Sequence, residues 1–65
     1  MGELTDDPKA IAASMIGKYG QDAEREARKY ALGHKSAGRA HDYMLWLEVV
    51  SIIVRRQKFL KSLDS

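Results

Sequence analysis

The segment from residue 43 to residue 54, YMLWLEVVSIIV, most constrains what this chain can fold into. It holds ten apolar residues, and its only polar members are Glu48 and Ser51. At about 100° per residue, a helix through this segment is apolar over most of its circumference, which is more surface than one short helix covers. The segment therefore predicts packing contacts on two of its sides.

The small size of the chain makes self-association the expected route to a stable fold. The chain has 65 residues and no cysteine, so disulfides and thiolate metal sites are excluded. One core in so small a domain rarely supplies more than about 3–5 kcal/mol of net stability without further support. The acidic start does not resemble a signal peptide, and the apolar segment is shorter than the roughly 20 residues that span a bilayer. We therefore expect a cytoplasmic protein with no membrane span.

A first helix is predicted over residues 8–35, after a disordered N-terminus at residues 1–7. Asp7 can cap it, and Pro8 suits its first position. Small and apolar residues recur along one side and stay in phase across Gly20, which favours one continuous helix. A break at Tyr19-Gly20 remains the alternative, because a glycine costs a helix about 1 kcal/mol relative to alanine. The small-residue stripe consists of Ala12, Ala13, Ile16, Tyr19, Gly20, Ala23, Ala27, Tyr30 and Ala31.

A turn is predicted at residues 36–39, with Gly38 in the left-handed conformation, and a second helix at residues 40–63. The apolar part of this helix divides into two faces. The first is expected to pack on helix one, with Trp46 as an anchor against Ala23 and Ala27, and comprises Tyr43, Trp46, Leu47, Val50, Ile53 and Val54. The second is expected to contact a second chain and comprises Leu45, Val49, Ile52, Phe59 and Leu63. The predicted fold is all-α: a two-helix antiparallel hairpin that dimerises into a four-helix bundle.

The pattern A-x-x-M-I-x-x-Y-G-x-x-A-x-x-x-A from Ala12 to Ala27, followed by Gly38 and by W-x-x-V-x-x-x-I from Trp46 to Ile53, resembles a group of small helical proteins common in alphaproteobacteria. The resemblance covers about two-thirds of the chain. It implies a helical hairpin and carries no activity. The chain departs from the group at Arg39, where an aspartate usually follows the glycine, which puts the cap of the second helix in doubt.

The chain has few residues of the types that bind metals or act in catalysis. His34 and His41 flank the predicted turn beside Asp42, and two histidines with a carboxylate form a conceivable transition-metal set, but their spacing matches no zinc motif. The acids that could act in catalysis lack an adjacent histidine and hydroxyl, so no catalytic residue, metal or cofactor is assigned and an enzyme is not expected. Two ion pairs are expected on the exposed side of helix one, Asp22 with Arg25 and Glu24 with Arg28.

The C-terminal helix carries the one basic cluster, Arg55, Arg56, Lys58 and Lys61. These cations spread around the helix, and such residues also suit a helix C-terminus without any ligand. The leading hypothesis is a non-enzymatic interaction or regulatory module that acts as a homodimer and can also dock on another protein. The alternative is a small nucleic-acid-binding regulator that uses the basic cluster. A peripheral membrane helix is a third hypothesis, although few lysines flank the start of the apolar arc.

Overall fold

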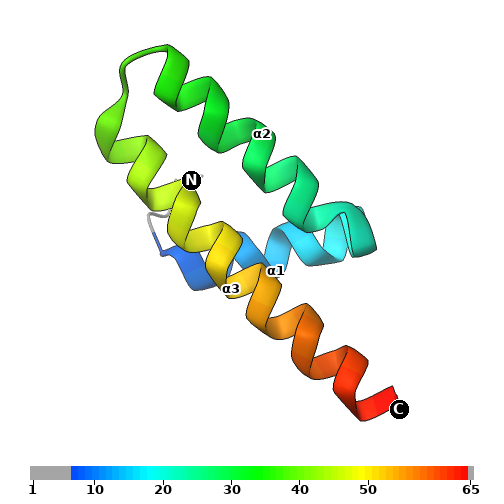
Figure 1. Cartoon of the computed structure of the whole chain (residues 1–65). Helices are drawn as coiled ribbons and strands as arrows, with labels where there is room; N and C mark the ends of the chain where they lie inside the picture. Colours follow the sequence, from blue (N-terminus) through cyan, green and yellow to red (C-terminus); the bar gives the residue numbers. More distant parts are fainter. Residues whose placement is uncertain (1–6, 65) are drawn as a thin grey trace, which may run out of the picture.

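The computed structural model describes the backbone of residues 7–64 and the side chains of residues 7–61, and its elements are all helical. Helix α1 (Pro8–Tyr19) is followed by a single 3-10 turn, η1 (Gly20–Asp22), and by α2 (Ala23–Ser36). Helix α3 (Ala40–Asp64) is the longest element. In Figure 1, α2 runs alongside α3, α1 crosses behind α3, and the C-terminal end of α3 projects beyond both.

Helix α1 begins as its sequence predicts. The Asp7 carboxylate accepts a hydrogen bond of 3.1 Å from the backbone N–H of Lys9, and Pro8 occupies the first turn. The capped amide would otherwise have no partner inside the helix, and proline has no N–H to leave unsatisfied. The start of the fold is therefore set by local chemistry.

The predicted uninterrupted helix over residues 8–35 is wrong, because the chain bends at Gly20. This residue has φ 59° and ψ −124°, a conformation that glycine adopts readily and that cannot continue an α-helix. The bend separates α1 from α2, so both helices contact α3. The side-chain amide of Gln57 donates a hydrogen bond of 2.8 Å to the Gly20 carbonyl, which ties the bend to α3.

The turn between α2 and α3 lies where the sequence places it. Gly38 has φ 77°, the left-handed conformation expected there. The N–H of Gly38 donates to the carbonyl of Lys35 at 3.1 Å, and the N–H of Arg39 donates to the carbonyl of His34 at 2.9 Å. These bonds satisfy carbonyls that the end of α2 leaves without helical partners.

The core lies where α1 and α2 meet α3 and is entirely apolar among the described residues. Alanines contributed by α1 and α2 let the helix backbones approach α3 closely, as the small-residue stripe predicts. Larger partly buried side chains, Trp46 among them, pack around the edge of the core. The buried residues are Ala12, Met15, Ala23, Ala27, Ala31, Val49, Val50 and Ile53.

Candidate interaction surface

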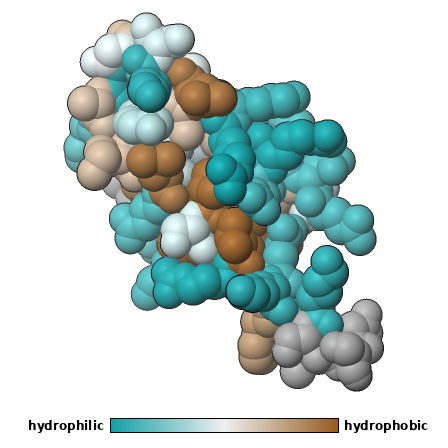
Figure 2. All heavy atoms as spheres, viewed as in Figure 1, coloured by the Kyte–Doolittle hydropathy of each residue, from teal (hydrophilic) through white to brown (hydrophobic). Residues whose placement is uncertain are grey.

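One side of α3 is only partly covered by α1 and α2, with Ile52 packed against the edge of the core, and we call it the outer face. It consists of Leu45, Glu48, Ile52, Arg55 and Phe59. Phe59 is 62% exposed, Glu48 and Arg55 are exposed, and Leu45 and Ile52 are half-buried. Figure 2 shows apolar side chains along the middle of α3 with hydrophilic ones to either side.

The structure corrects the predicted interface at Val49. This side chain is fully buried within the chain, because the bend at Gly20 lets α1 pack against α3. A second chain is therefore not needed to cover it. Leu45, Ile52 and Phe59 keep exposed surface, whereas the side chain of Leu63 lies outside the described residues.

The first predicted face of α3 is only partly enclosed. Val50 and Ile53 are buried, but Leu47 is 42% exposed, so its placement in the core is wrong. The helix that was expected to cover this whole face is divided at Gly20 into α1 and α2, which both contact α3. Four of the six large apolar side chains exposed among the described residues belong to α3: Met44, Leu47, Phe59 and Leu60.

Trp46 sits at the edge of the core rather than inside it. It stacks on Tyr30 of α2 with ring centroids 4.8 Å apart and planes at 23°. The ring of His34 also stacks on Trp46, with centroids 6.4 Å apart. These contacts join α2 to α3 near the turn. These contacts were not predicted from the sequence, although Tyr30 and His34 are four residues apart and so share one side of α2.

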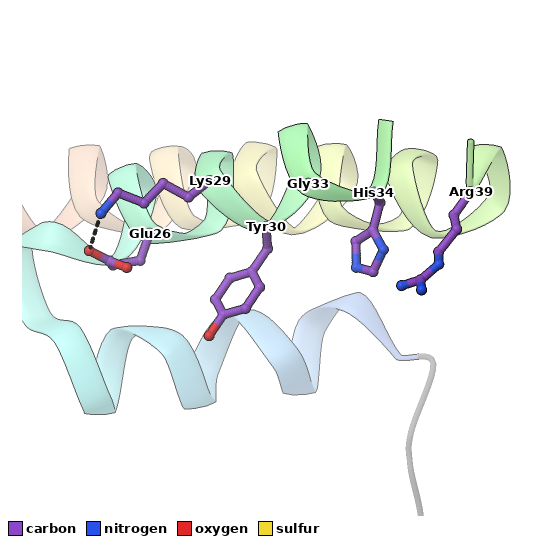
Figure 3. A pocket seen from close by; sticks show the side chains of 6 residues that line it. All are labelled: Glu26, Lys29, Tyr30, Gly33, His34 and Arg39. Carbon is purple, nitrogen blue, oxygen red and sulfur yellow. Dashed lines mark hydrogen bonds and ion pairs between the residues drawn. The ribbon is translucent and has the colours of Figure 1, made fainter. Parts of the chain in front are cut away.

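An open hollow lies beside this aromatic stack. Figure 3 shows Tyr30, His34 and Arg39 directed toward α1, while the ion pair between Lys29 and Glu26 lies at one end. The neighbouring Tyr19 side chain is the main cause that raises the pKa of Tyr30 above its usual value of 10.0. The hollow was not predicted from the sequence. Five of its six lining residues share one side of α2, and the α2–α3 turn adds Arg39.

The histidines do not form the metal set considered from the sequence. His34 Nδ1 lies 3.9 Å from Asp42 Oδ2, which is too far for a hydrogen bond, and it has no other hydrogen-bond partner. His41 is exposed. Within the described part of the chain, no three His, Cys, Asp or Glu side chains gather closely enough to hold a metal ion.

The acidic side chains of α2, and Asp22 at the end of η1, are engaged in local ion pairs. The two predicted pairs are confirmed, with Asp22–Arg25 at 3.1 Å and Glu24–Arg28 at 2.6 Å. All four side chains remain substantially exposed, so each pair stabilises the helix by about 0.5 kcal/mol or less. These acids therefore act in helix stabilisation.

The basic cluster is exposed at the projecting end of α3. Arg55, Arg56 and Lys58 make no ion pair with any carboxylate among residues 7–61, and Lys61 is exposed beside them. At about 100° per residue, the four cations point in different directions. Positive charge is thus spread over more than half of the circumference at this end rather than along one strip.

Comparison with known proteins adds no family: no family model, curated protein or solved structure matches the chain. Among the described residues, no helix is long and apolar enough to cross a membrane.

Proposed function

We propose that this protein is a non-enzymatic interaction module that works as a homodimer through the outer face of α3. The observation that carries the proposal is the exposure of Phe59, 62% accessible, in line with the half-buried Leu45 and Ile52. These three residues are spaced by seven and so lie on one side of the helix. A row of this kind favours contact with another helix over contact with water.

The size of the domain supports the same proposal. Its buried residues include four alanines, which bury little apolar area each. A core of small residues contributes modest stability, so association that covers Leu45, Ile52 and Phe59 would stabilise the folded chain. Folding and dimerisation would then be linked, and both would depend on protein concentration.

Sedimentation equilibrium and circular dichroism on the same samples test the proposal. We expect a dimer near 1 mM protein that dissociates on dilution, with helicity falling as it does so. Phe59→Ser should weaken the dimer. Leu32→Ser is the matched control, because Leu32 on α2 is 61% exposed but lies away from the outer face.

Comparing the two variants distinguishes a specific interface from nonspecific hydrophobic association. Equal loss of dimer in Phe59→Ser and Leu32→Ser would indicate nonspecific association. A monomer that keeps full helicity up to about 1 mM would refute the homodimer.

A second candidate is a small nucleic-acid-binding regulator. The observation that favours it is the lack of carboxylate partners for Arg55, Arg56 and Lys58 among the described side chains. Fluorescence anisotropy with a labelled DNA duplex tests it, because each phosphate contact adds about 0.9 to the slope of log affinity against log salt. Absence of binding at low ionic strength would eliminate this candidate.

A further inference from the structure

We infer that the second copy binds α3 in the antiparallel orientation, about a two-fold axis beside Ile52. Leu45 then packs on the partner's Phe59, and Glu48 lies beside the partner's Arg55. This inference rests on the proposed homodimer and specifies the geometry of its interface.

The apolar residues of the outer face are symmetric about Ile52. Leu45 precedes it by seven residues and Phe59 follows it by seven. Reversing the direction of one helix therefore brings Leu45 of each chain opposite the partner's Phe59 and leaves Ile52 near the axis. At each end of the contact, the exposed ring of Phe59 then packs on the partly exposed side chain of the other copy's Leu45.

The charged residues of the outer face favour the antiparallel orientation over the parallel one. Glu48 and Arg55 are also seven residues apart, so they lie on the same flank of the row, at about 20° from each other. In the antiparallel pair, each Glu48 meets the partner's Arg55, which gives two ion pairs. In a parallel pair, the two-fold axis runs along the helices and places the partner's Glu48 and Arg55 on the opposite flank, so neither ion pair forms.

Both charged side chains are available for this contact. Glu48 and Arg55 are exposed, and neither forms an ion pair with another side chain of residues 7–61. The antiparallel orientation also places the two basic ends of α3 at opposite ends of the dimer. A parallel orientation would bring Arg55, Arg56 and Lys58 of both copies together, where like charges repel.

The area of the contact sets the strength to expect. The row from Leu45 to Phe59 spans about 21 Å of helix. One helix pair of this length lies at the low end of specific interfaces, which bury about 1,200 Å² or more. We therefore expect a weak, reversible dimer that is populated at high protein concentration and weakened by salt.

A charge-swap experiment tests the orientation. Glu48→Arg and Arg55→Glu should each weaken dimerisation by about tenfold, because each replaces two attractions per dimer with two repulsions. The double variant Glu48→Arg/Arg55→Glu should return to within about threefold of the unmodified protein. Lys58→Glu is the matched control, because it changes net charge as Arg55→Glu does but lies off the outer face.

The outcomes separate this inference from the proposed function. Loss in the single variants with recovery in the double variant supports the antiparallel contact. A dimer unchanged in all variants, or weakened as much by Lys58→Glu as by Arg55→Glu, overturns the orientation while the homodimer stands. A protein that stays monomeric to about 1 mM overturns both, including where it binds a DNA duplex or anionic vesicles instead.

Engineered cysteines give a second readout that does not depend on charge, since the chain has none of its own. A mixture of Glu48→Cys and Arg55→Cys chains should form a disulfide between unlike chains under mild oxidation, while neither variant alone should cross-link efficiently. The requirement is a Cα separation of about 4.4–6.8 Å. No cross-linking between unlike chains, at a concentration where the dimer is populated, would refute the inference.

Discussion

Replacing Gly20 with alanine tests the bend between α1 and α2. The conformation of Gly20, φ 59° and ψ −124°, is one that residues with a Cβ rarely adopt. No atom lies within 4 Å of the position that an added Cβ would take, so a steric clash contributes nothing to the cost. The whole effect therefore comes from the backbone.

The expected magnitude follows from two opposing contributions. Backbone strain of this kind costs about 1–3 kcal/mol. Alanine also reduces the conformational freedom of the unfolded chain, which offsets about 0.4–1 kcal/mol. Gly20→Ala should therefore lower the free energy of unfolding by about 1–2 kcal/mol, and the midpoint of thermal unfolding by about 5–15 °C for a domain of this size.

Gly17→Ala provides a control three residues away. Gly17 lies inside α1 with ordinary helical geometry, and an added Cβ there also meets no atom within 4 Å. This substitution should raise the free energy of unfolding by about 0.5–1 kcal/mol, because alanine favours the helix. The same chemical change is thus expected to have opposite effects at the two positions.

Thermal unfolding followed by circular dichroism, at one fixed protein concentration, distinguishes the two effects. If Gly20→Ala were as stabilising as Gly17→Ala, Gly20 would have to be helical. The chain would then contain one straight helix over residues 8–35, and Val49 would lose the cover that α1 gives it.

Three further results are expected. Gln57→Ala should lower stability by about 1 kcal/mol in urea unfolding, because the Gly20 carbonyl loses its donor; an unchanged midpoint would show that this hydrogen bond does not stabilise the bend. Ile53→Ala should cost about 2–5 kcal/mol and remove most helical signal, since the side chain is fully buried; retained helicity would contradict that burial. Folding raises the pKa of Tyr30, so the protonated hydroxyl should contribute fully to stability below about pH 10, and this contribution should be lost as pH rises through the raised pKa. In urea unfolding at alkaline pH, Tyr30→Phe should therefore lose less stability than the unmodified protein. An equal loss of stability would show that the Tyr30 hydroxyl makes no such contribution.

The sequence was sufficient for features fixed by neighbouring residues. Capping by Asp7, the left-handed Gly38 and the ion pairs of α2 each depend on groups within a few positions, and the structure has all of them. These are local interactions whose geometry repeats from protein to protein. Their prediction needs no knowledge of the tertiary fold.

The bend at Gly20 could not be predicted in the same way. The small-residue stripe stays in phase across it, so the pattern fits both a straight helix and two helices joined by a bend. What decides between them is distant in sequence: the hydrogen bond from Gln57, 37 residues away, and the burial of Val49 under α1. The error at Gly20 then caused the error at Val49, because cover from α1 was attributed to a second chain.

The alanines of the core have a consequence for how this fold tolerates mutation. Half of the eight buried residues found in the described region are alanine, and truncating an alanine removes only one methyl group. Larger side chains at these positions should be more destabilising. Extra methyl groups at Ala23 or Ala27 would force α2 away from α3, at a cost of about 1–3 kcal/mol each. We expect variation at these positions to be limited to glycine and serine, while the large residues of α3 accept other hydrophobic side chains of similar volume.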